Sequence, residues 1–409
     1  MNRPTQKFML AILGVGALVL SGCSGTSSKS SMGSGGNGGG GGTGSNDLAI
    51  TVNTGPTGNY VDGAFTSVMV CAPGSTTNCQ TISGILVDTG SSGLRIMASA
   101  LTVSLKQQMG VGNNPVVECL PFVDGVTWGP VQTADVTMAG ETAKALPIQV
   151  IGSTSFSTVP AGCSSQGAPE DSVALFGANG VLGVGNFAQD CGGGCTVSGG
   201  SNAGFYYTCA GQNCSITTES LVSQVANPVT FFTGDNNGVM IQLPAVTGAE
   251  TTVSGSLIFG IGTRSNNGLG SATVFTMDPT NGNFSTTFNG IAHSDASFLD
   301  TGSNGIYFLD AQSTSLPICT NFSFWYCPTT TQNLSATNQG INGATASVNF
   351  TVGNAQTLTA NASDAAVNGL AGPDTATFDW GLPFFFGRTV FVAIEGQNTP
   401  GGSGPYVAY

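Results

Sequence analysis

Two copies of one short pattern, one in each half of the chain, constrain the fold more than any other feature. The first is "GILVDTGSSGLRI", Gly84–Ile96, and the second is "ASFLDTGSNGIYF", Ala296–Phe308. In both copies an apolar run ends in Asp-Thr-Gly-Ser, and a second apolar run follows. Glycine permits a tight turn, and the hydroxyl groups can bond to neighbouring backbone and carboxylate groups. The sequence therefore predicts two similar halves, each with a strand that ends in an acidic turn.

The composition favours β-structure with many turns. Of 409 residues, 62 are glycine and only 7% are charged. Short runs rich in Val, Ile, Thr and Phe alternate with Gly, Asn, Pro and Ser, which is typical of a two-layered, mostly antiparallel β-protein. Residues 97–109 and 218–225 are the best candidates for helices. The formal net charge of −13, with no basic cluster, argues against a nucleic-acid partner.

The first 22 residues are organised as an export signal. Arg3 and Lys7 precede the apolar run "FMLAILGVGALVL", Phe8–Leu20. Thirteen residues are too few to span a bilayer comfortably, so this run predicts a cleaved signal peptide over residues 1–22.

The end of that signal resembles a bacterial lipobox. "LSGC", Leu20–Cys23, places small residues before a cysteine, so we expect lipidation at Cys23; an ordinary secretory signal is the alternative. Ser24 follows, which by resemblance to Gram-negative lipoproteins favours the outer membrane, on its periplasmic or surface face. Residues 23–46 comprise this cysteine and a Gly/Ser-rich tether. We expect a monomer held at the cell envelope by its lipid anchor.

Ten cysteines remain after Cys23, an even number in an exported chain. Such a count predicts five disulfides, with Cys71–Cys79 and Cys319–Cys327 as natural loop closures. Zinc is the alternative for the cluster within residues 191–214, but no histidine lies nearby, and we expect no metal. The predicted disulfide cysteines are Cys71, Cys79, Cys119, Cys163, Cys191, Cys195, Cys209, Cys214, Cys319 and Cys327.

The two acidic turns resemble those of the pepsin-like aspartic peptidases, and the resemblance covers most of residues 47–409. "NGVLGVGN", Asn179–Asn186, and "FDWGLPFFFGRTVFVAI", Phe378–Ile394, look like the family's hydrophobic-hydrophobic-Gly segments beside the Asp loops. Phe122–Gly140 lies where the substrate-covering flap is expected.

The resemblance implies a mostly β, bilobal pepsin-like fold of two similar β-lobes with the cleft between them. The N-terminal lobe would comprise residues 47–243 and the C-terminal lobe residues 244–409. The uncharacterised bacterial lipoproteins of the pepsin-like superfamily are similar in organisation.

The resemblance also implies roles for single residues. Asp88 and Asp300 would form a catalytic dyad that shares one proton, because two adjacent carboxylates repel each other. One acid would activate a water molecule, the other would polarise the scissile carbonyl, and no cofactor is needed. Around the dyad, Thr89 and Thr301 would lock the loops together, Gly90 and Gly302 would form the turns, Ser91 and Ser303 would follow them, Ser92 would support Asp88 through its hydroxyl, and Phe122 and Trp128 would cover the substrate.

Four positions depart from the family pattern. Arg95 stands where a Trp is usual, and Phe122 stands where the flap has its Tyr. Asn304 replaces the hydroxyl residue that would support Asp300, and Asp379 occupies an apolar position that brings an extra carboxylate toward the dyad.

Two functions are therefore consistent with the sequence. The first is a lipid-anchored aspartic endopeptidase that hydrolyses peptide bonds in polypeptide substrates. The second is a catalytically weak or inactive pepsin-fold lipoprotein that binds peptides or envelope partners. A Ser-His-Asp or Cys-His enzyme is disfavoured, because His293 is the only histidine of the chain.

Overall fold

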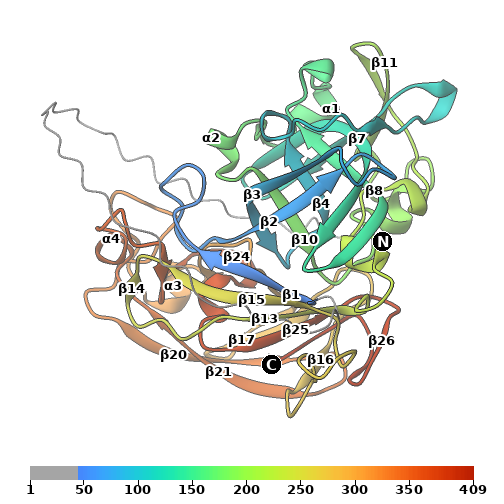
Figure 1. The fold of residues 1–409 in the computed structure, drawn as a ribbon. Coiled ribbons are helices and arrows are strands. Elements are labelled where there is room, and N and C mark those ends of the chain that lie inside the picture. The colour runs from blue at the N-terminus through green and yellow to red at the C-terminus, as the bar shows by residue number, and fades with distance from the viewer. Residues whose placement is uncertain (1–44) are drawn as a thin grey trace, which may run out of the picture.

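The computed structural model describes residues 45–409, so the predicted signal peptide, Cys23 and most of the tether lie outside the described residues. The body consists of two β-rich lobes, the first coloured blue to green and the second yellow to red (Figure 1). The predicted mostly β, bilobal pepsin-like fold is confirmed. No helix within the described part of the chain has the length and apolar character needed to cross a membrane.

The first lobe is a twisted β-structure that carries the first acidic turn. Strand β2 pairs with both β3 and the long hairpin strand β7, and β10 lies between β3 and β4 (Figure 1). The strands of this lobe are β2 Ala64–Cys71, β3 Cys79–Asp88, β4 Ser92–Met97, β5 Lys106–Gln107, β6 Val116–Pro121, β7 Gly125–Met138, β8 Glu141–Ile151, β9 Ala168–Pro169, β10 Gly180–Val184, β11 Tyr206–Ala210 and β12 Asn213–Ile216.

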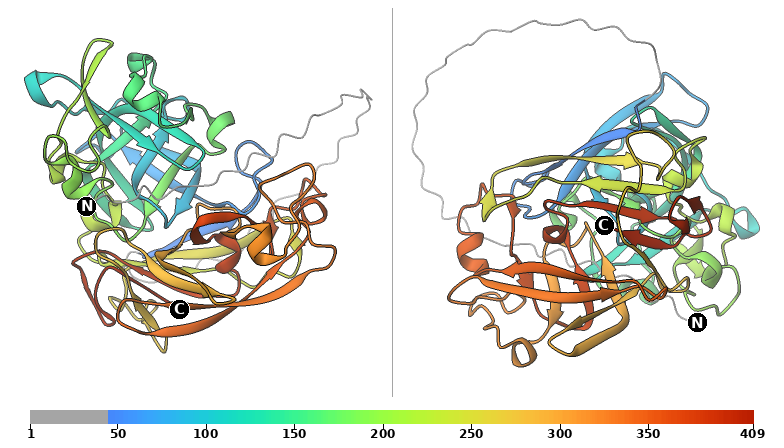
Figure 2. Two further views of the ribbon diagram at one scale, coloured as in Figure 1. Left: turned by 180° about the vertical axis from the view of Figure 1, so that it is seen from behind. Right: turned by 90° about the horizontal axis from the view of Figure 1, so that it is seen from below.

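A second group of strands joins the two lobes. The first strand of the body, β1, pairs along its whole length with β15, and β13, β25, β28 and β16 continue that sheet (Figure 2). Early and late parts of the chain therefore share one sheet. Its strands are β1 Asp47–Val52, β13 Gly238–Gln242, β15 Val253–Phe259, β16 Val274–Thr276, β25 Thr389–Ala393 and β28 Tyr406–Ala408.

The second lobe carries the second acidic turn on a seven-stranded sheet of order β21-β20-β17-β18-β24-β19-β23. These strands are β17 Phe284–Phe288, β18 Ile291–Leu299, β19 Ile306–Leu309, β20 Gln332–Gln339, β21 Thr345–Val352, β23 Ala371–Gly372 and β24 Asp374–Trp380. Two short pairs complete the β-structure: β14 Ala249–Glu250 with β22 Ala366–Val367, and β26 Asn398–Thr399 with β27 Gly402–Ser403.

Helices are short within residues 45–409, and both predicted helices are wrong. Residues 97–109 form only a 3₁₀ turn, Ala98–Ala100, and then the strand β5, which pairs with β7. Residues 218–225 contain only the 3₁₀ turn Leu221–Ser223. Isolated helices of this length are marginal, so strand pairing decides the conformation. The helices present are α1 Ala161–Ser164, α2 Val173–Phe176, α3 Ala311–Thr314 and α4 Ala355–Leu358, and further 3₁₀ turns cover Val111–Asn113, Thr154–Phe156, Gly192–Cys195, Pro228–Phe231 and Leu382–Phe384.

All ten cysteines form disulfides as predicted, and two of the five pairs, Cys71–Cys79 and Cys319–Cys327, are those expected from the sequence. Five disulfides join Cys71–Cys79, Cys119–Cys163, Cys191–Cys195, Cys209–Cys214 and Cys319–Cys327. The zinc alternative for the cluster within residues 191–214 is wrong, because all four of its sulfurs are in disulfide bonds. Within residues 45–409, no three His, Cys, Asp or Glu side chains gather as a metal-binding group.

Candidate active site

The two acidic turns lie at equivalent places in the two lobes. Asp88 ends β3 and Asp300 follows β18, and each strand has a parallel neighbour, β10 or β24, at that point. Both aspartates are fully buried, with 0% and 1% of their surface exposed. The largest cluster of buried apolar side chains runs from one lobe into the other and includes Val87 and Leu299, which precede the acids. Apolar strands thus position both carboxyl groups.

Four crossed hydrogen bonds hold the two turns against each other. The Thr89 amide donates to Thr301 Oγ1 at 3.1 Å, and the Thr301 amide donates to Thr89 Oγ1 at 3.0 Å. The two hydroxyls donate in turn to the carbonyls of Leu299 and Val87, at 2.9 and 2.8 Å. Because all four groups are buried and paired, the relative position of the two loops is fixed.

Close approach requires the glycine of the first turn. The amides of Gly90 and Gly302 donate to Oδ1 of Asp88 and Asp300, both at 2.7 Å. A Cβ atom on Gly90 would lie 2.6 Å from Cγ of Asp300 and 2.7 Å from both of its carboxyl oxygens. The carboxyl group of Asp300 therefore rests directly on the first acidic turn, which brings it beside Asp88.

The electrostatics of the pair differ between the two acids. Burial raises the pKa of Asp88 well above its ordinary value, and the charge of Asp300 raises it further. Burial also raises the pKa of Asp300, but hydrogen bonds from Asp88 and from the backbone of Gly302 offset part of that rise. Two buried carboxyl groups this close share one proton, and the larger rise in the pKa of Asp88 favours that proton on Asp88, with the negative charge on Asp300.

A serine hydroxyl donates a hydrogen bond to each acid, but the prediction that Ser92 supports Asp88 is wrong. Ser91 donates to Oδ2 of Asp88, and Ser303 donates to Oδ2 of Asp300 at 2.9 Å. Ser92 does not reach the dyad, because its hydroxyl donates to the carbonyl of Phe187 at 2.7 Å.

Asn304 has no hydroxyl group with which to support Asp300, and the Ser303 hydroxyl donates that hydrogen bond instead. Asn304 itself is buried, and its side-chain oxygen accepts a hydrogen bond from the Tyr307 hydroxyl at 2.7 Å. A third carboxyl group, that of Asp379, also reaches this serine: its Oδ2 lies 2.6 Å from Ser303 Oγ.

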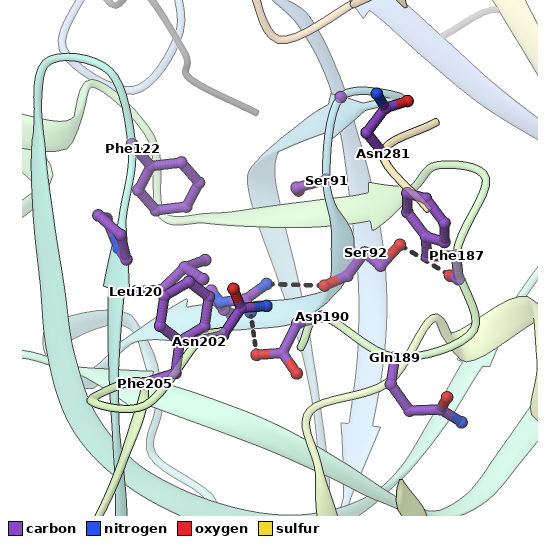
Figure 3. A pocket seen from close by; sticks show the side chains of 13 residues that line it. Ser91, Ser92, Leu120, Phe122, Phe187, Gln189, Asp190, Asn202, Phe205 and Asn281 are labelled. Carbon is purple, nitrogen blue, oxygen red and sulfur yellow. Dashed lines mark hydrogen bonds and ion pairs between the residues drawn. The ribbon is translucent and has the colours of Figure 1, made fainter. Parts of the chain in front are cut away.

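A pocket opens beside the first acidic turn (Figure 3). Apolar side chains, including Phe122, face polar ones across it. The ring of Phe122 packs against Phe176 with centroids 5.9 Å apart. The pocket is lined by Gly90, Ser91, Ser92, Arg95, Leu120, Pro121, Phe122, Phe187, Gln189, Asp190, Asn202, Phe205 and Asn281.

Trp128 does not line this pocket, so the prediction that it covers the substrate is wrong. Its indole N–H donates to the carbonyl of Phe156 at 2.8 Å, and its ring packs edge-on against Tyr207 at 5.2 Å. These contacts hold Trp128 in an apolar cluster separate from the one that contains Phe122.

Arg95, which lines the pocket, forms a buried ion cluster. Its guanidinium donates to Glu118 at 2.8 Å and to Asp190 at 3.1 Å, and none of the three side chains is more than 2% exposed. The Tyr206 hydroxyl donates to the other oxygen of Asp190 at 2.8 Å. Glu118, Asp190 and Tyr206 were not predicted as site residues from the sequence. A signal was available, because Arg95 and Glu118 both stand inside apolar strand runs, where a charge needs a partner.

A second group of acidic residues lies near the turn between β6 and β7 and was also not predicted. Glu170 is almost fully buried, and burial followed by the charge of Asp124 raises its pKa to about 9. A Cβ atom on Gly125 would lie 2.4 Å from Cγ of Glu170. Burial raises the pKa of Tyr60, and the charges of Asp124 and Asp300 raise it further. Short loops between strands carry no pattern that predicts such a meeting.

These observations define a pepsin-like fold with two carboxyl groups paired at the junction of its lobes. Among solved structures, the chain is similar to an aspartic proteinase from Irpex lacteus, with a TM-score of 0.51, 16% identity and coverage of 88% of this chain and 96% of that one. The chain belongs to the family described as "Protein of unknown function (DUF3443)", whose model matches residues 42–409. No curated protein matches the sequence.

Proposed function

We propose that this protein is an aspartic-type endopeptidase that hydrolyses peptide bonds in polypeptide substrates. The observation that carries the proposal is the buried pair of Asp88 and Asp300, with the Asp300 carboxyl group packed on the first acidic turn and the two turns fixed by reciprocal threonine contacts. A rigid carboxyl pair that shares one proton combines a general acid and a general base in one place.

The mechanism follows from the assignment of charge. Asp300, as the ionised member, takes a proton from a water molecule that attacks the scissile carbonyl. Asp88, as the protonated member, donates a hydrogen bond to the carbonyl oxygen and stabilises the charge that develops there. The proton is then delivered to the leaving amine, and no residue becomes acylated. The pocket beside Ser91 and Phe122 would hold a substrate side chain next to the cut bond.

The test is cleavage of a peptide library by the mature chain, produced with Cys23→Ser so that it is not lipidated. We expect a bell-shaped pH profile with an acidic optimum, because the dyad must hold one proton. Asp88→Asn and Asp300→Asn should each lower kcat at least a thousandfold and leave the fold intact. Cleavage that survives both substitutions would contradict the assignment. Peptide binding without cleavage between about pH 3 and 7 would favour the second function, a peptide-binding lipoprotein, for which Phe122 without a hydroxyl is the supporting observation.

We also propose that the protein is a lipoprotein of the cell envelope, anchored through Cys23, which lies outside the described residues. The supporting observation is the lipobox-like segment followed by a Gly/Ser-rich tether. Cys23→Ser should move the protein from the membrane fraction to the soluble fraction and abolish palmitate labelling. Unchanged fractionation would contradict the proposal.

A further inference from the structure

A third buried carboxyl group stands beside the dyad and has no part in the mechanism above. Asp379 lies on β24, opposite Phe298 of β18 and opposite Tyr307 of β19. Its side chain is 3% exposed, and within the described structure its Oδ1 is buried without a hydrogen-bond partner. A buried carboxylate with an unpaired oxygen is costly, whereas a neutral carboxyl group is not.

The hydroxyl of Ser303 links this group to the dyad. Ser303 Oγ lies 2.9 Å from Oδ2 of Asp300 and 2.6 Å from Oδ2 of Asp379. A serine hydroxyl carries one proton and can donate it to only one of these oxygens. The other short contact therefore needs a protonated carboxyl group as the donor, so either Asp300 or Asp379 is neutral.

The remaining contacts decide which acid is neutral. Asp300 accepts a hydrogen bond from the amide of Gly302 at 2.7 Å, and interaction with the protonated Asp88 lowers its pKa. Both favour its charged form. Asp379 has no comparable donor at Oδ1.

The groups that surround Asp379 also disfavour a charge on it. Burial and then the charge of Asp300 raise its pKa well above the ordinary value, the hydrogen bond with Ser303 offsets part of this rise, and the charge of Asp374 adds to it. The facing hydroxyl of Tyr307 on β19 donates to Asn304 instead.

We propose that Asp379 is a positioning residue whose neutral carboxyl group donates to Ser303 Oγ and directs the serine proton to Asp300, which keeps Asp300 the ionised member of the dyad. The proposal rests on the proposed peptidase function. Ionisation of Asp379 reverses the arrangement: the serine proton turns to Asp379, and Asp300 loses a donor and faces a second negative charge.

The first test does not depend on activity. It compares unfolding of the unlipidated wild-type chain and Asp379→Asn as a function of pH, with Asp295→Asn, at an exposed position on the neighbouring strand β18, as the matched control. Asparagine keeps the volume and can donate to Ser303. Folding takes up a proton at a neutral Asp379, so the wild-type unfolding constant should rise about tenfold per pH unit relative to Asp379→Asn, above about pH 4. Asp295→Asn should follow the wild type. Parallel wild-type and Asp379→Asn curves would overturn the proposal.

The second test is kinetic. Asp379→Leu removes the donor and should lower kcat about tenfold with KM unchanged. The acidic limb of the kcat profile should also move up by about one pH unit, because Asp300 is less stabilised as an anion. Asp379→Asn should recover most of the lost rate. Asp379→Leu should cost nothing more in a Ser303→Ala background, since Asp379 acts through that serine. Additive losses, or an Asp379→Asn variant as impaired as Asp379→Leu, would overturn the proposal.

The two tests separate the two proposals. If no variant and no wild-type chain cuts peptides, the proposed function fails, and the unfolding comparison still decides the protonation of Asp379. If Asp379→Leu does not fold, the comparison of wild type with Asp379→Asn is sufficient.

Discussion

At the scale of single residues, the site depends on atoms that approach one another more closely than ordinary side chains allow. A Cβ atom on residue 90 would lie only 2.6 Å from Cγ of Asp300, so only glycine fits there. The hydroxyl group of Ser303 lies within hydrogen-bond distance of two acids, Asp300 and Asp379. The identity of these residues is therefore set by geometry as much as by chemistry.

Gly90→Ala should abolish peptide cleavage and lower the free energy of unfolding by about 2–4 kcal/mol, because the new methyl group overlaps the Asp300 carboxyl group. Gly193→Ala is the matched control, since no atom lies within 4 Å of a Cβ built there. Both variants are measured by chemical denaturation and by the peptide-library assay. An active, fully stable Gly90→Ala variant would show that the two turns do not pack as described.

At the scale of elements, strand pairing places the residues, and disulfides fasten the loops that leave the strands. Cys119 on β6 is bonded to Cys163 on α1, across 44 residues. Cys209 and Cys214 instead close the short turn between β11 and β12, across 5 residues. The first bond links the β6–β7 hairpin to a distant segment, whereas the second joins strands that are already paired.

Removal of the longer bond should cost more stability. In the chain-entropy model, a loop of 44 residues corresponds to about 4 kcal/mol and a loop of 5 residues to about 2 kcal/mol. We expect the double variant Cys119→Ala/Cys163→Ala to be less stable than Cys209→Ala/Cys214→Ala by about 2 kcal/mol in urea denaturation. Equal losses would indicate that loop length does not determine the effect.

At the scale of the whole molecule, the protein combines few cations with many buried acids. The chain has 8 Lys and Arg against 21 Asp and Glu. A small number of cations limits the positive charge that accumulates at acidic pH and destabilises a compact state. Buried acids whose pKa is raised by folding are Asp62, Asp88, Glu170, Asp190, Asp300 and Asp379.

Stability should therefore be greatest at acidic pH. An acid whose pKa is raised by folding binds a proton in the folded state that it has lost in the unfolded state above about pH 4. Its contribution is present below that pH and is lost as the pH rises toward its folded pKa, which for Glu170 is about 9. We expect the free energy of unfolding to fall by at least about 1.4 kcal/mol per pH unit from pH 4 to 7, measured by urea denaturation. A stability maximum at neutral pH would contradict this prediction.

The sequence alone determined the features that depend on local pattern. Each Asp-Thr-Gly turn follows an apolar run, so the strands, the turns and the β-rich fold could be predicted from neighbouring residues. An even number of cysteines after a predicted export signal was enough to predict that they pair. The weak helical patterns at 97–109 and 218–225 failed, because contacts between distant strands outweigh the propensity of a short segment.

Only the tertiary structure decided which groups share a proton or a charge. Ser303 and Asp379 are 76 residues apart, and Arg95 meets Asp190 across 95 residues. Even adjacent residues have different partners: Ser91 donates to the carboxyl group of Asp88, whereas Ser92 donates to the carbonyl of Phe187. A hydrogen bond needs a donor and an acceptor within about 3 Å, and the spacing of residues along the chain does not specify distances that small between remote strands.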